Sequence, residues 1–210
     1  GEEAHPMNTI IDYGLGNIRA FVNVYNSLNV HTNIAQSPKD LEGASKIVLP
    51  GVGAFDYAMS RLNASGMRDE LENQVLREGV PILGICVGMQ MLAKGSEEGT
   101  LPGLNWVEGE VELFKAEKFS YKKPLPHMGW NTLNISQNNK LLRNLDNQAR
   151  FYFLHSYYFH TQNQENIIGT TEYGIMYASA INQDNIYGVQ FHPEKSHSNG
   201  IQLLKNYSEI

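Results

Sequence analysis

The single cysteine of the chain, Cys86, lies in a sequence pattern that favours a nucleophile. The segment 84–88, Gly-Ile-Cys-Val-Gly, follows a short apolar run and leads into a helix-like stretch at 89–93. This is the nucleophile-elbow pattern, with Cys in the place of Ser. At such an elbow the glycines allow a sharp turn, the N–H of Val87 points toward an oxyanion, and the start of the helix favours a thiolate. A packed cysteine in a glycine-rich turn would explain this pentapeptide equally well.

A base for this nucleophile is available in the segment 188–194, which contains His192 and Glu194. On an extended segment, residues two apart project to the same side, and Pro193 would stiffen that geometry. A carboxylate beside an imidazole fixes its tautomer and stabilises the imidazolium. Taken singly, His192 fits a capped strand end and Glu194 a solvated charge. Combined with the cysteine elbow, they predict a Cys-His-Glu triad.

The composition argues against several other classes of function. Acidic residues outnumber basic ones, 22 to 16, and no run of Lys and Arg alternates with aromatics, so no nucleic-acid site is expected. No apolar stretch reaches the roughly 18 residues that a membrane-spanning helix needs. The seven histidines, which include His155 and His160, form no metal-binding motif, and no metal site is predicted.

The cysteine count and the first residues bear on the cellular compartment. One cysteine cannot form an internal disulfide, and the opening of the chain has neither the basic start nor the apolar centre of a signal peptide. We therefore expect a protein of the reducing cytoplasm. Residues 1–6 are interpreted as the remnant of an expression tag, with Met7 as the natural start, and residues 7–210 as a single domain.

Apolar runs and helical patterns alternate through the first half of the chain. Strands are predicted at 8–12, 46–49 and 81–85, and helices at 18–28 and 67–75. Such alternation is typical of a parallel sheet with helices on both faces. The second half holds short aromatic or branched runs that predict further strands, some antiparallel, at 151–154, 157–159, 167–169 and 186–191. A last helix is predicted at 200–207, and the whole chain is expected to form one α/β fold with a mixed sheet.

Several longer motifs resemble a known family. Segments 84–90, 191–196 and 49–53 resemble the triad-type, class I glutamine amidotransferases. Three further motifs, at 12–17, 126–131 and 152–158, resemble the glutaminase subunits of imidazole glycerol phosphate synthases within that family. The resemblance extends over the chain from Met7 onward. It implies a flavodoxin-like, three-layer α/β fold and a glutaminase that uses no cofactor.

The resemblance implies a role for individual residues. Cys86 would attack the side-chain amide of glutamine, His192 would transfer protons, and Glu194 would orient His192. The oxyanion would be held by the Val87 N–H and by the backbone of Gly51, Val52 and Gly53, whose peptides would have to turn before a second donor points inward. Glutamine recognition is implied for Gln90, Glu98, His155, Ser156 and Tyr157, although Glu97, next to Glu98, is an alternative for that position.

The same resemblance implies a partner. Ammonia would pass to a (β/α)8-barrel cyclase that makes imidazole glycerol phosphate and AICAR in histidine biosynthesis, as a heterodimer with this chain. Residues expected at the interface are Asn17, Met128, Trp130 and Lys195. Trp130 would be an anchor on a loop. Judged without the family, it would instead be interpreted as a core residue.

Two alternatives remain open from the sequence. Val87 and Asn105 depart from the residues usual in the family, which leaves room for a glutaminase that feeds another synthase, such as an amidotransferase acting on a surface sugar. The other alternative is a protein of a different class, in which Cys86 is a sensor or a binding residue without turnover. The intact His192-Pro193-Glu194 segment and the motifs for glutamine recognition argue against it.

Overall fold

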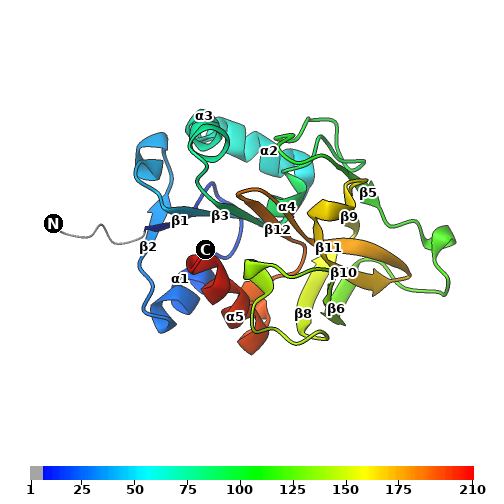
Figure 1. Cartoon of the computed structure of the whole chain (residues 1–210). Helices are drawn as coiled ribbons and strands as arrows, with labels where there is room; N and C mark the ends of the chain where they lie inside the picture. The colour runs from blue at the N-terminus through cyan, green and yellow to red at the C-terminus, as the bar shows by residue number, and fades with distance from the viewer. Residues whose placement is uncertain (1–6) are drawn as a thin grey trace.

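The computed structural model describes residues 7–210, and the predicted tag remnant at 1–6 lies outside the described residues. A parallel sheet forms one half of the fold (Figure 1). Its strands follow the order β2-β1-β3-β4-β12, and each pairs in parallel with its neighbours. Their bounds are β1 (Asn8–Ile11), β2 (Thr32–Ala35), β3 (Lys46–Gly51), β4 (Ile82–Cys86) and β12 (Ile186–Val189).

Antiparallel strands continue the same sheet beyond β12 and make it mixed. They run in the order β12-β11-β10-β7, while β9 pairs with both β11 and β5. Their bounds are β5 (Glu110–Leu113), β7 (Asn134–Ile135), β9 (Tyr157–His160), β10 (Ile167–Tyr173) and β11 (Ile175–Gln183). A separate two-stranded sheet pairs β6 (His127–Thr132) with β8 (Arg150–His155).

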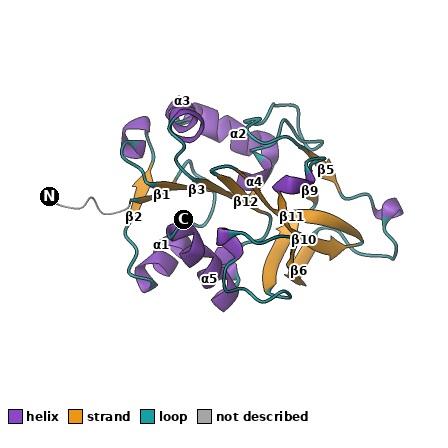
Figure 2. Cartoon of the chain, viewed as in Figure 1, coloured by secondary structure: helices purple, strands orange, loops and turns teal. Residues whose placement is uncertain are grey.

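Helices cover both faces of the parallel half (Figure 2). Helices α2 and α3 lie on one face, and α1 and α5 lie together on the other. The bounds are α1 (Ile18–Ser27), α2 (Phe55–Ala64), α3 (Arg68–Glu72), α4 (Val87–Gln90) and α5 (His197–Ser208), with a π-helical turn at Asn73–Arg77 after α3. Because both faces are covered, β1, β3, β4 and β12 are buried along their whole length. The predicted three-layer α/β fold with a mixed sheet is confirmed.

Individual elements differ from the prediction. Helix α2 was not predicted, although its buried residues Phe55, Ala58, Met59 and Leu62 have helical spacing. The helix predicted at 67–75 is divided between α3 and the π-helical turn. None of the helices in the described part of the chain is long and apolar enough to cross a membrane.

Glycines permit the close approach of α4 to strands β3 and β4. A Cβ on Gly88 would overlap the carbonyl oxygen of Leu49 in β3, and a Cβ on Gly84 would lie 2.6 Å from the carbonyl oxygen of Gly88. Both contacts are with backbone atoms, which cannot move aside by changing a rotamer. The turn from β4 into α4 therefore excludes any larger residue at these two positions.

We predict that Gly88→Ala destabilises the fold by about 2 kcal/mol or more, because the added methyl group has to displace strand β3. The free energy of unfolding, measured in urea, tests this. Gly95→Ala is the matched control, since a Cβ at Gly95 would meet nothing within 4 Å. Equal stability of the two variants would contradict the proposed packing constraint.

Candidate active site

Cys86 is held in a strained backbone conformation at the end of β4. Its φ is +57° and its ψ is −113°, a region that residues with a side chain rarely adopt. The residue directly precedes α4, and its side chain is only 3% exposed. The helix that follows is shorter than predicted: α4 ends at Gln90, and residues 91–93 continue in turns rather than in a helix. The predicted elbow geometry is thus present, and it is followed by a single helical turn.

Neighbouring strands bring the other predicted catalytic residues to Cys86. Strand β12 runs parallel to β4 with Val189 opposite Ile85, so the chain leaving β12 passes the Cys86 end of β4. His192 lies three residues beyond Val189. On the other side, Gly51 at the end of β3 pairs directly with Cys86. The carboxyl ends of three adjacent parallel strands therefore form the site, which is where open α/β sheets place their ligands.

His192 and Glu194 are in contact, but not through the predicted extended segment. Nδ1 of His192 lies 3.2 Å and 3.4 Å from the two carboxylate oxygens of Glu194. The segment Pro193–Lys195 is a 3-10 turn, so the expectation of an extended segment from His192 to Glu194 was wrong. It is the turn that folds the carboxylate back onto the imidazole. Ser196 closes the turn by donating a 2.6 Å hydrogen bond to the His192 carbonyl.

The surroundings of His192 change its titration. Burial alone lowers the pKa of the imidazole, but hydrogen bonds to Cys86 and Glu194 and the negative charges of both groups outweigh it and raise the pKa to about 10. Nδ1 contacts Glu194, which leaves Nε2 for the sulfur of Cys86. At neutral pH the ring is therefore an imidazolium between two partners, able to donate a proton.

A cavity of about 310 Å³ opens directly over Cys86. Most of the sequence-predicted site residues line it together, with Pro126 and Leu154 in addition: Val52, Gly53, Cys86, Val87, Gln90, Glu98, His155, Ser156, Tyr157, His192 and Lys195. Glu194 lies behind His192, and Gly51 is buried in β3 beside the cysteine. Asn17, Met128 and Trp130 do not line the cavity.

Several cavity residues are already hydrogen-bonded within the protein. Gln90 donates to the Tyr157 carbonyl and to the Gln190 side chain, each at 3.1 Å. Glu98, and not Glu97, reaches the cavity: its carboxylate accepts a hydrogen bond from the Phe55 N–H, whereas Glu97 pairs with Lys115. Both ring nitrogens of His155 contact protein groups, so in this arrangement the ring offers no free nitrogen to a substrate.

The sequence interpretation assigned no role to Gln190, which contacts the nucleophile. Its amide nitrogen lies 3.7 Å from the Cys86 sulfur, and the Leu154 carbonyl oxygen lies 3.9 Å from it on another side. Gln190 precedes His192 by two residues, a spacing that could have indicated a shared side of the segment. Leu154 contributes only a backbone carbonyl, which no residue pattern reveals.

An exposed apolar patch borders the cavity. It consists of Met128, Trp130 and Leu154, whose side chains are 65%, 41% and 38% exposed. Met128 faces Leu154 across the β6–β8 pair, and Leu154 also lines the cavity. Trp130 lies in strand β6, so both its predicted loop position and its interpretation as a core residue were wrong; its ring stacks on His197. Asn17 caps helix α1 by accepting the N–H of Ala20.

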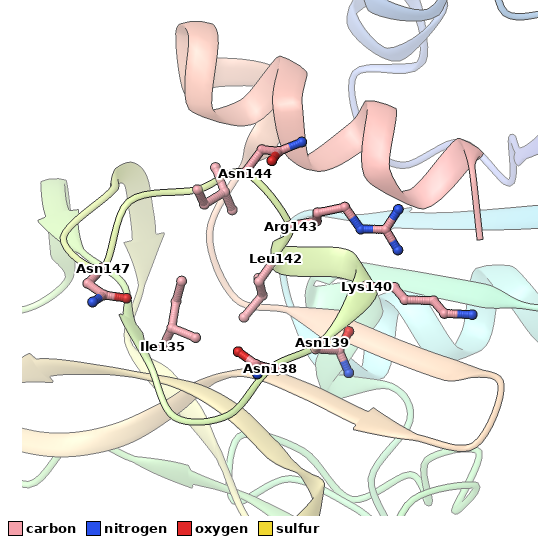
Figure 3. Close-up of a pocket in the computed structure, with 9 residues that line it drawn as sticks. Ile135, Asn138, Asn139, Lys140, Leu142, Arg143, Asn144 and Asn147 are labelled. Atoms are coloured by element: carbon pink, nitrogen blue, oxygen red, sulfur yellow. The ribbon is translucent and has the colours of Figure 1, made fainter.

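A larger cavity lies elsewhere in the described structure. It has a volume of about 500 Å³ and is lined by Ile135, Asn138, Asn139, Lys140, Leu142, Arg143, Asn144, Leu145 and Asn147 (Figure 3). Lys140 and Arg143 point away from it in this view. None of the triad residues contributes to it, and asparagine amides and aliphatic side chains dominate its wall. The cavity over Cys86 is therefore the one equipped for nucleophilic chemistry.

Comparison with known proteins gives one consistent result. A model of the family "Glutamine amidotransferase class-I" matches residues 9–208. The imidazole glycerol phosphate synthase subunit HisH of Bdellovibrio bacteriovorus is 52% identical over 97% of this chain and 100% of its own length. The HisH subunit of Leptospira borgpetersenii is 46% identical over 96% of this chain and 98% of its own. The chain belongs to the HisH family of class I glutamine amidotransferases.

Solved structures agree at the level of the fold. A crystal structure of a glutamine amidotransferase superposes with a TM-score of 0.72 at 17% identity, covering 96% of this chain and 99% of that one. A glutamine amidotransferase from Thermotoga maritima gives a TM-score of 0.65 at 18% identity, covering 99% of this chain and 84% of that one. This chain thus shares its fold with glutamine amidotransferases to which it has less than 20% sequence identity.

We predict that Glu194→Gln lowers the pKa of His192 from about 10 by at least about one unit, because the variant keeps the shape of the side chain and removes its charge. A pKa raised above the unfolded value of about 6.5 stabilises the fold fully below pH 6.5, and that stabilisation is lost as the pH rises toward 10. The variant should therefore lose less stability than the wild type between pH 6 and pH 9.

NMR titration of the His192 ring measures the pKa directly, and urea unfolding at the two pH values measures the stability. Glu117→Gln, which removes a charge from an exposed turn, is the control. An unaltered His192 pKa in Glu194→Gln would show that the carboxylate does not hold the proton on the ring.

Proposed function

We propose that this chain is the glutaminase subunit of an imidazole glycerol phosphate synthase. It hydrolyses glutamine to glutamate and ammonia and supplies the ammonia to a cyclase in histidine biosynthesis. The observation that carries the proposal is the contact of Cys86, His192 and Glu194 at one cavity in a chain of the HisH family. Residues 7–210 act as one glutaminase domain. A free thiol nucleophile works in a reducing compartment, and the cytoplasm provides one.

In the first half of the reaction, the Cys86 sulfur attacks the side-chain carbonyl carbon of glutamine. The carbonyl oxygen becomes an oxyanion, held by the Val87 N–H and by backbone N–H groups of the segment 51–53. His192 then gives its proton to the amide nitrogen, the carbon–nitrogen bond breaks, and ammonia leaves. A glutamyl thioester on Cys86 and a neutral His192 remain.

In the second half, water hydrolyses the thioester. The neutral His192 takes a proton from the attacking water, the new oxyanion collapses, and the carbon–sulfur bond breaks. The product leaves as the γ-carboxylic acid, which loses its proton to solvent to become glutamate, and the Cys86 thiolate and the His192 imidazolium are restored. Glu194 remains ionised throughout and orients the ring through Nδ1. One water is consumed for each ammonia released.

Glutamine is held, in this proposal, by the walls of the cavity over Cys86. Glu98 provides a carboxylate for the α-ammonium group, and Gln90, His155, Ser156 and Tyr157 line the same cavity. Lys195, which is exposed to solvent, also lines this cavity. A cavity of this size suits a single amino acid rather than a longer peptide.

The partner in this proposal is a (β/α)8-barrel cyclase that docks on the apolar patch. Met128 and Trp130 are large, exposed and next to the cavity, which is the composition expected at the centre of an interface. Asn17 and Lys195 would complete the contact. Docking here places the partner over the opening from which ammonia leaves, so the neutral molecule can be transferred without being protonated in bulk water.

We predict that Cys86→Ala lowers glutamate release by at least about a thousandfold, because no other group in the chain can form the thioester. Glutamate is measured with and without the barrel cyclase of the same organism and its ribonucleotide substrate. Wild-type turnover that rises strongly with both supports the histidine pathway. Cys86-dependent turnover that ignores the cyclase assigns the glutaminase to another synthase, and undiminished turnover in Cys86→Ala rejects the mechanism.

We predict that Trp130→Ala weakens binding to the cyclase by about 30-fold, the loss expected for an aromatic anchor worth about 2 kcal/mol. Glutamine binding should change little, because Trp130 does not line the cavity. Titration calorimetry with each ligand separates the two effects. Met176→Ala, at a residue that is 59% exposed and lies outside the patch, is the control. Equal losses for both ligands would exclude a docking role.

A further inference from the structure

Two histidines and a tyrosine form a buried cluster behind the cavity wall. His127 of β6, His155 of β8 and Tyr177 of β11 are each less than 8% exposed. Their polar atoms form a triangle with sides of 3.1 Å, joining Nδ1 of His127, Nε2 of His155 and the Tyr177 hydroxyl. The ring of His127 is also stacked on Tyr173 and Phe153. The catalytic mechanism uses none of these three polar groups.

One end of the cluster fixes the tautomer of His127. Asn131 is held in one orientation, because its oxygen accepts the N–H of Thr132 at 2.7 Å and its nitrogen donates to the Glu172 carbonyl at 2.8 Å. The second hydrogen on that nitrogen points to Nε2 of His127, 3.2 Å away. Nε2 must therefore accept, and the proton of His127 is on Nδ1.

The other end fixes the tautomer of His155. Nδ1 of His155 lies 2.7 Å from the Tyr157 carbonyl oxygen, which can only accept, so Nδ1 carries the proton and Nε2 accepts. The Tyr177 hydroxyl must then accept from His127 and donate to His155. Burial keeps both rings neutral by lowering the pKa of His127 to about 4 and that of His155 to about 3. A single arrangement of protons satisfies every contact.

The chain of hydrogen bonds ends at the nucleophile. The Tyr157 carbonyl that accepts from His155 also accepts from Gln90, which donates to Gln190, whose amide nitrogen faces the Cys86 sulfur. The intervening strand corner, residues 154–157, lines the cavity and presents the Leu154 carbonyl to the same sulfur. The position of this corner relative to Cys86 thus depends on the bond that His155 makes.

We propose that His127, Tyr177 and His155 are positioning residues, joined in a one-directional hydrogen-bond relay that holds the 154–157 corner of the cavity against Cys86. The proposal deepens the proposed function, on which it rests for the identity of glutamine as the substrate. The relay itself is a property of the folded chain. It can therefore be tested without glutamine or a partner.

The first test reads the tautomers by NMR of the full chain with ¹⁵N-labelled histidine. Both His127 and His155 are expected in the Nδ1–H form between pH 6 and pH 8. An Nε2–H form at His155 would overturn the proposal, because the ring could not donate to the Tyr157 carbonyl. This measurement needs no variant, so it decides the point even if the substitutions below prevent folding.

The second test follows alkylation of Cys86 by iodoacetamide, which mass spectrometry reports unambiguously because the chain has one cysteine. Nε2 of His155 has two donors within reach, so Tyr177→Phe and His127→Leu should each change the rate by less than about threefold. Together they remove both donors. The double variant is expected to react at least about tenfold more slowly, a loss greater than the product of the two single effects.

A conservative double variant separates positioning from packing. In Tyr177→Phe with His127→Asn, the amide nitrogen is as many bonds from the backbone as Nδ1, so a donor is restored, whereas Leu has the same size and none. Alkylation within about threefold of the wild type is expected. Equal rates for the Asn and Leu doubles would overturn the relay. A wild type that follows these expectations but releases no glutamate would leave the relay intact and remove the glutaminase function instead.

Discussion

The reversal of the chain at Cys86 is the constraint on which the rest of the site depends. Strand β4 has to end and α4 has to begin within one residue, in contact with the backbone of β3. Only a residue at positive φ allows that, and only glycines fit two positions before and after it, at Gly84 and Gly88. Packing on both faces of the sheet stabilises this strained conformation, because neither β3 nor β4 can move without disturbing a helical layer. The sulfur is consequently held at a fixed point at the sheet edge.

The fixed position of the Cys86 sulfur also determines the charge interactions in the site. The sulfur, the imidazole and the Glu194 carboxylate are all buried, so their charges act on one another with little screening by solvent. Burial disfavours a charged imidazole, yet the hydrogen bonds and charge interactions with Cys86 and Glu194 outweigh it and raise the pKa of His192 to about 10. The neighbouring histidine, His155, has no such neighbours and stays neutral. Of these two histidines at the same cavity, His192 is therefore protonated and can donate a proton, whereas His155 is neutral and can accept a hydrogen bond at Nε2.

Much of the fold and of the site could be predicted from the sequence. The features that could not be predicted depend on a local turn geometry or on contacts between distant residues. The elbow, the triad residues and the parallel strands depend on local patterns: glycines around Cys86, two-residue spacing at His192, and apolar runs in buried strands. The 3-10 turn after His192 was missed because Pro193 is compatible with both a strand and a turn. The hydrogen-bond relay joins residues up to 50 positions apart, and only the pairing of β6, β8 and β11 with their neighbours brings them together.

Strand β6 carries two kinds of surface. Met128 and Trp130 face outward, while His127 and Asn131 alternate with them and face the buried relay. A slip of one residue in the pairing of β6 with β8 would exchange the two sets, exposing the histidine and burying the tryptophan. The register of β6 therefore determines both the exposed apolar patch and the buried hydrogen-bond relay. A shift of the β6 register cannot change the exposed patch without also disrupting the buried relay.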